Sequence, residues 1–212
     1  MLWSIFSDPM QIVYRVPAIL FALSMHEWAH AFAAFRLGDP TARNFGRLTI
    51  NPIPHIDPIG LLSLLLLGFG WAKPVPINTR FFHHPRRDEL IVSVAGVVTN
   101  LLLAFVSAGV FFLFAGSGIQ NEAAYQIIFN FISINLGLCV FNLLPLPPLD
   151  GYHVAECLFL RGKTSFKIFS FLGQYGAYIL YALVLTGAIS NITLPVTGAL
   201  LRGIMAFWGL LL

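Results

Sequence analysis

Two histidines and a glutamate interrupt an otherwise apolar stretch, ALSMHEWAHAFAA, between Ala22 and Ala34. His26 and His30 are four residues apart, so on a helix their imidazoles share one face. Imidazole nitrogen is a common zinc ligand, and Glu27 would lie near a metal-bound water. The pattern therefore predicts a catalytic zinc site on a helix. The alternative is a polar cluster that packs helices together, but ionisable groups inside an apolar segment are costly and usually functional.

A catalytic zinc site usually has three protein ligands and a water, so one ligand must come from elsewhere. The candidates are the remaining histidines and two acidic residues: His55, His83, His84, Asp150, His153 and Glu156. Asp150 is the most suggestive, because three prolines in FNLLPLPPLDG interrupt the end of an apolar helix just before it. Non-helical backbone at membrane depth is tolerated only where it is buried in protein or lines a watery cavity. The residues alone leave the third ligand open.

The composition indicates that membrane helices position these groups. Hydrophobic residues make up 58% of the chain and charged residues 10%, with a mean hydropathy of +0.81, whereas about a quarter of the residues in soluble domains are charged. The net charge of +3 comes from basic residues scattered between apolar blocks, so we expect a lipid bilayer and no nucleic acid as partner. The first residues lack a basic region and a cleavage site, so we expect no signal peptide.

Five apolar segments reach the length of about twenty residues that crosses the hydrocarbon core. They run approximately over Met10–Leu37, Leu90–Ala115, Tyr125–Leu146, Lys167–Ala188 and Ile192–Leu212. A sixth segment, Asp57 to Ala72, has only about fifteen residues that read as apolar helix, so it could cross or dip in and return. The loop before it predicts a small β-hairpin or irregular structure. The expected fold is an all-α polytopic membrane protein with one domain over residues 1–212.

HEWAH followed downstream by NLLPLPPLDG resembles the site-2 protease family of intramembrane zinc metallopeptidases. The loop GWAKPVPIN is similar to that of its compact prokaryotic members without a PDZ domain, and the resemblance extends to about Gly151. It implies one zinc ion per chain bound by His26, His30 and Asp150, with Glu27 as the general base. The implied substrates are transmembrane proteins or peptides, cut in or near their membrane-spanning segments.

The resemblance also implies roles for two asparagines. Asn142, in the second motif, is expected to bind the substrate backbone or to stabilise the oxyanion. SVAGVVTN resembles the family's helix motif ending in asparagine, so Asn100 is a second candidate for this role, although Val97 stands where a proline is common. Either asparagine could instead form a hydrogen bond between helices.

The basic residues predict a membrane topology. If the short segment re-enters, the helix ends next to His30 and Asp150 lie on the same side, as binding to one metal ion requires. Ten of the twelve basic residues then share that side: Arg36, Arg43, Arg47, Lys73, Arg80, Arg86, Arg87, Arg161, Lys163 and Lys167. By the positive-inside rule this side is the cytoplasm. We therefore expect a multi-pass protein of a prokaryotic cell membrane, with its N-terminus outside and its active site toward the cytoplasm.

Two other classes of function would use the same residues. A non-catalytic zinc-binding membrane protein could keep the fold, but binding zinc alone does not require Glu27. A metal transporter could use the histidines as a transit site, but transporters tend to show internal repeats and polar residues on several helices, and the sequence shows neither. We therefore favour a zinc-dependent intramembrane endopeptidase.

Overall fold

Long helices dominate the fold of the computed structural model, which describes residues 10–67 and 70–211. Among these residues, five helices are long and apolar enough to span a membrane. They are α2 (Met10–Arg36), α5 (Pro85–Gly116), α6 (Glu122–Asn142), α8 (Gly162–Leu185) and α9 (Ala188–Leu211). Leu212, the end of the last predicted span, lies outside the described residues. The prediction of an all-α, multi-pass membrane protein with five spans is confirmed.

Shorter helices connect the long ones. They are α3 (Thr41–Asn44), η1 (Ile53–His55), α4 (Pro58–Leu67), η2 (Thr79–Phe81) and α7 (Asp150–Phe159). The short apolar segment predicted from the sequence contains α4, whose ten residues extend about 15 Å. This length is about half the thickness of the hydrocarbon core. Residues 68–69 of the segment lie outside the described residues.

The β-hairpin expected after the first helix is wrong, and the irregular alternative is what the structure shows. Within residues 40–58 there are only α3, η1, turns, bends and the first residue of α4, and the single β-bridge of this loop joins Ile56 to Ala72. Four prolines in these residues cannot donate to a strand ladder. Side chains hold the loop instead: Asp39 accepts hydrogen bonds from the backbone N–H groups of Thr41 and Asn78.

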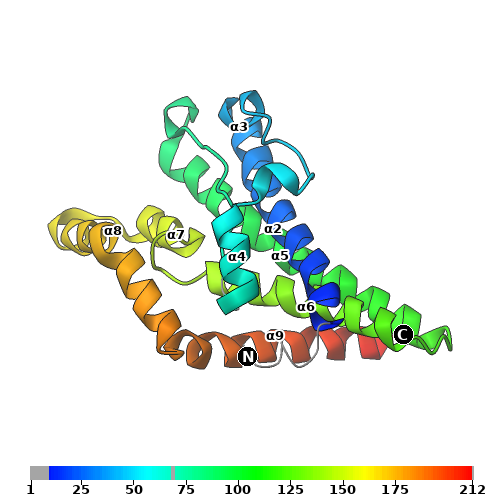
Figure 1. The fold of residues 1–212 in the computed structure, drawn as a ribbon. Helices are drawn as coiled ribbons and strands as arrows, with labels where there is room; N and C mark the ends of the chain where they lie inside the picture. Colours follow the sequence, from blue (N-terminus) through cyan, green and yellow to red (C-terminus); the bar gives the residue numbers. More distant parts are fainter. Residues whose placement is uncertain (1–9, 68–69, 212) are drawn as a thin grey trace.

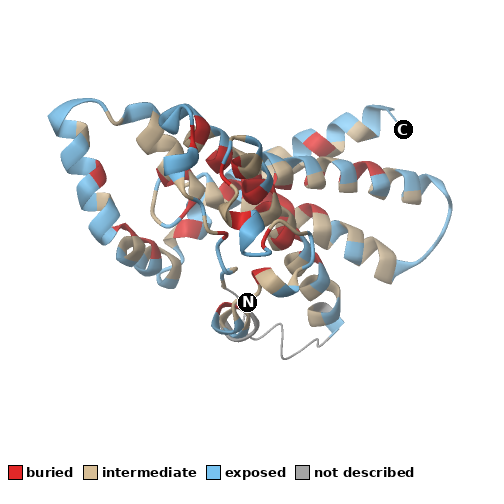
Figure 2. Ribbon diagram, turned by 90° about the horizontal axis from the view of Figure 1, so that it is seen from above, coloured by how far each residue is buried: buried red, intermediate tan, exposed pale blue. Residues whose placement is uncertain are grey.

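The centre of the molecule is formed by α2, α5 and α6, which pack against one another (Figure 1). The C-terminal half of α9 crosses α5 and α6, where Ala104 and Ala108 pack against Ile132, Leu136 and Ile204. The small alanine side chains let these helices approach closely, as is typical of membrane helices. Buried residues concentrate around this centre, whereas α8 lies to one side and is mostly exposed (Figure 2).

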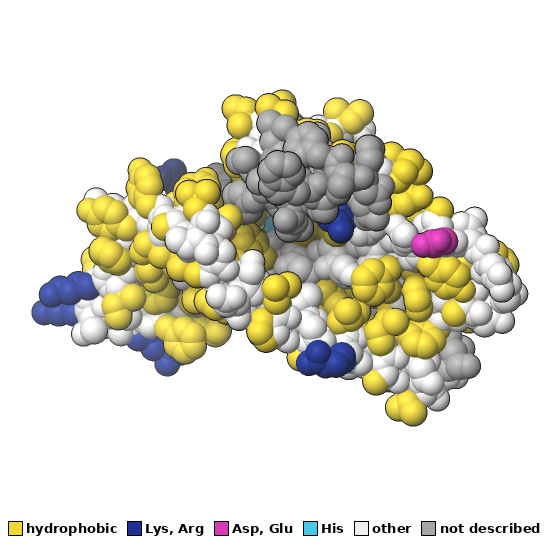
Figure 3. Space-filling view, turned by 60° about the horizontal axis from the view of Figure 1, so that its bottom comes forward, with side chains coloured by type: hydrophobic (Ala, Val, Ile, Leu, Met, Phe, Trp, Pro, Cys, Tyr) yellow, Lys and Arg dark blue, Asp and Glu magenta, His cyan; other side chains and the backbone are white. Residues whose placement is uncertain are grey.

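The outer surface of the helices is apolar. On α5, one stripe consists of Leu102, Val106, Val110 and Leu113, whose side chains are 47–61% exposed. The lower face of the molecule carries many hydrophobic side chains and few charged ones (Figure 3). Large apolar side chains on the outer surface are the reverse of what water favours, and they match a lipid environment.

Candidate metal centre

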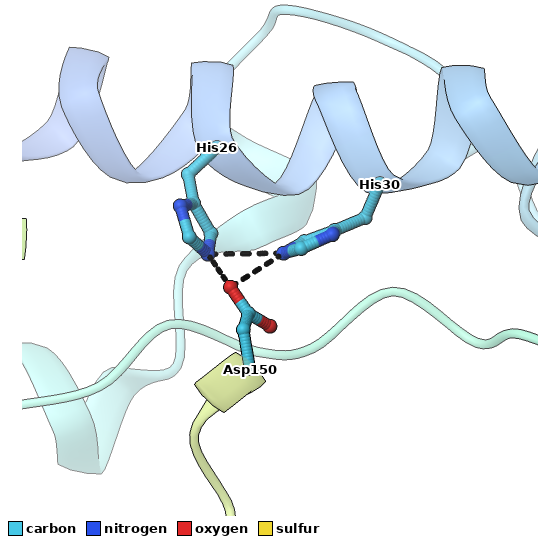
Figure 4. Close-up of side chains that lie close together, drawn as sticks. All are labelled: His26, His30 and Asp150. Atoms are coloured by element: carbon cyan, nitrogen blue, oxygen red, sulfur yellow. Dashed lines mark hydrogen bonds and ion pairs between the residues drawn. The ribbon is translucent and has the colours of Figure 1, made fainter. Parts of the chain in front are cut away.

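His26 and His30 of α2 converge on Asp150, the first residue of α7 (Figure 4). The two Nε2 atoms are 3.0 Å apart, and they lie 3.2 Å and 3.3 Å from Asp150 Oδ2. Both histidines are at least 94% buried. One helical turn separates the two imidazoles, so the helix alone brings them together, whereas Asp150 arrives from more than a hundred residues away.

The non-helical segment between α6 and α7 places the carboxylate of Asp150. The prolines after α6 prevent the helix from continuing, and a new helix begins directly at Asp150. Gly151 lies against the end of α6, where an added Cβ would come within 2.3 Å of Leu143 O. The glycine is therefore required for α7 to approach the backbone of α6 this closely.

The outer nitrogens of both imidazoles are held by acceptors. His30 Nδ1 lies 2.8 Å from the carbonyl oxygen of Val92, and His26 Nδ1 lies 2.6 Å from Asn100 Oδ1. The oxygen of a backbone or side-chain amide only accepts hydrogen bonds. Each Nδ1 therefore carries a proton, and each neutral ring presents a lone pair at Nε2. Partners of this kind typically fix the tautomer of metal-binding histidines.

Three lone pairs therefore face one another without a shared proton. Asp150 Oδ2 is buried and has no hydrogen-bond partner among the described residues. A tetrahedral zinc ion with bonds of about 2.0–2.2 Å holds its ligand atoms about 3.3–3.5 Å apart. The observed separations of 3.0–3.3 Å are close to this spacing. The cluster fits a zinc ion, which would use all three lone pairs.

Gly96 of α5 makes room for the imidazoles. A Cβ at this position would lie 2.6 Å from both His26 Cε1 and His30 Nε2. Our sequence analysis did not single out this residue. The available signal was its spacing, since Gly96 and Asn100 are four residues apart and lie on the same face of α5.

Glu27 of α2 contacts the loop that follows α4. Its Oε2 accepts a hydrogen bond of 2.8 Å from the backbone N–H of Val75. Arg47, which is 7% exposed, donates to the carbonyl oxygen of Lys73, 2.5 Å away. Burial lowers the pKa of the Arg47 guanidinium, and the nearby Glu27 carboxylate acts against this shift. A buried cation thus holds the backbone of the loop at Lys73, close enough to Glu27 for the two charges to interact.

Comparison with known proteins gives the family. YwhC of Bacillus subtilis, named as a zinc metalloprotease, is 42% identical over 197 residues, which is 85% of this chain and 90% of that protein. The chain belongs to the site-2 protease family. Rip2 of Mycolicibacterium smegmatis, named likewise, is 32% identical over 182 residues, covering 81% of this chain and 66% of Rip2. No protein-family model and no solved structure matches the chain. This site-2 protease family member is a zinc metalloprotease.

The other metal-ligand candidates of this site-2 protease homologue lie elsewhere. His55 is buried, with its Nδ1 3.3 Å from Arg47 Nη2 and its Nε2 2.8 Å from Thr49 O. His153 pairs with Glu89, and His83, His84 and Glu156 are at least partly exposed. Within residues 10–67 and 70–211, the structure brings no second group of three potential ligands together.

The two asparagines of the family motifs differ in their surroundings. Asn142 is half-buried at the end of α6, and its Nδ2 donates to Leu138 O of its own helix. Asn100 is fully buried, and its Nδ2 donates to Ala22 O and Asn135 Oδ1. Both N–H groups of Asn100 are therefore occupied, which leaves none to stabilise an oxyanion. Its contact with His26 favours a role in orienting this candidate metal ligand.

Proposed function

We propose that this protein hydrolyses peptide bonds in or near the membrane-spanning segments of membrane protein substrates. The proposal takes residues 1–212 as a single membrane-embedded protease domain with one zinc ion bound by His26, His30 and Asp150. The observation that carries it is the convergence of three buried lone pairs next to Glu27, inside a bundle of apolar helices. A protease for soluble peptides would not need a site enclosed by helices that can span a membrane.

In this mechanism His26 and His30 of α2 bind the metal, and Glu27 of the same helix transfers the proton. The chemistry that zinc supplies when bound is Lewis acidity, which lowers the pKa of water to about 7 and polarises a carbonyl. Glu27 accepts the proton of the attacking water and returns it to the leaving amine. The N–H of Val75 orients the Glu27 carboxylate for this transfer. Asn142, at the end of α6, binds the substrate backbone or the oxyanion with its amide group.

The substrate helix has to unwind before it is cut. Within a helix, each peptide carbonyl accepts a hydrogen bond from the amide four residues later, so it is not available for attack. In a bilayer the freed backbone groups need protein partners. We therefore expect substrates with helix-breaking residues near the cleavage site to be cut faster.

The proposed topology places the site toward the cytoplasmic side of a prokaryotic cell membrane. The 3.3 Å separation of His30 Nε2 and Asp150 Oδ2 requires the adjoining ends of α2 and α6 to lie on the same side. This requirement is met if α4, only ten residues long, dips into the bilayer and returns. The side that then collects the basic residues is the cytoplasm.

Cysteine labelling tests this topology. In a background without Cys139 and Cys157, Thr79→Cys should react with an impermeant reagent only from the cytoplasmic side, and Gln120→Cys only from the opposite side. Both native residues are exposed. Labelling of the two positions from the same side would contradict the proposed arrangement.

Cleavage of a model single-span substrate in liposomes tests the function. The wild-type protein should cut within the span, whereas Glu27→Gln should keep about one zinc ion per chain and lose the activity. Glu122→Gln is the matched control, since Glu122 is exposed at the start of α6, and it should cut like the wild type. Equal cleavage by Glu27→Gln and the wild type would exclude Glu27 as the base.

A further inference from the structure

Two asparagines connect α6 to His26 through α5. Asn135 and Asn100 are both 0% exposed. Asn135 Nδ2 donates to Phe131 O at 2.8 Å, and Asn135 Oδ1 accepts from Asn100 Nδ2 at 2.8 Å. Asn100 Oδ1 lies 2.6 Å from His26 Nδ1. The series of bonds thus begins at a backbone carbonyl and ends at a histidine ring.

The backbone carbonyl determines the direction of every bond in the series. Phe131 O can only accept, so Asn135 must turn its NH₂ group to it and its oxygen to Asn100. Asn100 then turns its NH₂ group to Asn135, and the same group also donates to Ala22 O at 3.2 Å. Its oxygen is left facing His26. Nδ1 of His26 must therefore carry the proton, which leaves the lone pair on Nε2.

The reverse orientation of Asn100 would block the metal site. With its amide rotated, Asn100 would donate an N–H to His26 Nδ1, and the neutral ring would carry its proton on Nε2. A protonated Nε2 has no lone pair for a metal ion. Asn135 and the carbonyl group of Ala22 oppose this rotation together, and the bond to Asn135 is the shorter of the two. After the rotation, their oxygens would face the oxygen of Asn100 in a buried, apolar environment where unsatisfied polar groups are costly.

We infer that Asn135 is a positioning residue that, through Asn100, holds His26 in the tautomer that binds zinc. The inference rests on the proposed role of His26 as a zinc ligand. Asn135 touches neither His26 nor Asp150 among the hydrogen bonds of the described residues, so its effect is on the metal site and not on the reacting atoms. Partners behind metal ligands typically change metal affinity 10–100-fold when they are replaced.

Zinc affinity of the Asn135→Leu variant tests the inference. Leucine branches at Cγ as asparagine does, and on α6 it would lie beside the buried apolar residues Ile132 and Leu136, so we expect the variant to fold, and the thermal midpoint of the metal-free protein is measured beside that of a control variant. Asn130→Leu is that control, because Asn130 lies on the same helix and makes the same type of bond, to Gln126 O at 2.9 Å. Competition with a chelator should give roughly 10–100-fold weaker zinc binding for Asn135→Leu and wild-type binding for Asn130→Leu.

The Asn100→Asp background separates positioning from packing. Both oxygens of an aspartate only accept, so this side chain keeps His26 Nδ1 protonated without help from Asn135. The second oxygen of the aspartate would face Asn135 Oδ1, and the leucine removes this contact between two acceptors. Asn135→Leu should therefore weaken zinc binding in the wild-type background and should not weaken it in the Asn100→Asp background. The visible absorption of bound Co²⁺ should be altered by Asn135→Leu in the first background alone. A role of Asn135 in packing only would give the same loss in both.

The outcomes for this inference and for the proposed function are distinguishable, because zinc affinity is measured without substrate. Unchanged zinc affinity in Asn135→Leu, together with substrate cleavage by the wild type, would overturn the inference and leave the proposed function intact. Equal losses of affinity in both backgrounds would also overturn it. The predicted pattern of affinities would support the inference even if the wild type failed to cut the substrate.

Discussion

The backbone N–H of Val75 donates a hydrogen bond of 2.8 Å to Glu27 Oε2, across 48 residues of sequence. Prolines precede and follow Val75, and neither can donate, so this N–H is the donor that the stretch Pro74 to Pro76 offers. The carboxylate next to His26 is thus oriented by main chain, and the loop after α4 takes part in the site through its backbone.

Removal of this N–H is expected to slow catalysis without removing the metal. Val75→Pro should lower kcat roughly tenfold or more, because hydrogen bonds to charged groups contribute about 1.5–3 kcal/mol. Val75→Ala keeps the N–H while losing the side chain that packs against Ala31 and Ala42, so it should retain most of the activity. Zinc content and kcat are measured for both variants. Equal loss in the two would assign the effect to packing.

A methyl group at Gly96 is expected to destroy the metal site. Gly96→Ala would place Cβ 2.6 Å from atoms of both His26 and His30, so the imidazoles must move and zinc should be lost together with activity. Gly137→Ala, where nothing lies within 4 Å of the added Cβ, is the control and should bind one zinc. Zinc per chain is measured by elemental analysis. Full zinc content in Gly96→Ala would show that the site is wider than the structure indicates.

Zinc removal is expected to destabilise the protein as well as inactivate it, because three lone pairs then face one another in a buried site. Chelation should lower the thermal midpoint. Added zinc at about a hundred times its Kd should restore about 2.7 kcal/mol of the free energy of unfolding. His30→Ala lacks one of the proposed ligands, so its thermal midpoint should respond little to zinc. A response as large as that of the wild type would place the stabilising ion elsewhere.

The contact between α7 and α5 is expected to depend on pH. His153 Nδ1 lies 3.4 Å from Glu89 Oε1, and this pairing raises the pKa of His153 above 6.5. The folded pKa is above the unfolded one, so the stabilisation is full below about pH 6.5 and is lost as the pH rises through the folded pKa. Since the side chain of His153 is 45% exposed, this pairing should contribute less than about 1 kcal/mol to the free energy of unfolding.

Glu89→Gln tests this pH dependence. Its thermal midpoint should lie below that of the wild type at mildly acidic pH, and the difference should shrink as the solution becomes alkaline. Glu122→Gln, at the exposed start of α6, should show no such trend over the same range. A difference that grows with pH would mean that another group dominates.

Local sequence was sufficient for the long helices and for two of the three candidate metal ligands. The five spans follow from runs of apolar residues long enough to cross a bilayer, and His26 and His30 share a face because a helix repeats every 3.6 residues. The loop after α2 was less predictable. Its prolines allowed either a hairpin or an irregular path, and distant partners such as Asn78, which donates to Asp39, hold it in the irregular one.

The sequence by itself determined the membrane class, the five spans and the pair of histidines, because these depend on composition and on spacing within one helix. The convergence of Asp150 on that pair, suggested by family resemblance, was decided by the tertiary structure. So were the fit of Gly96 against both rings and the series of bonds from Phe131 to His26. These contacts join residues of different helices, and their distances depend on how closely the helices pack, which no local pattern specifies.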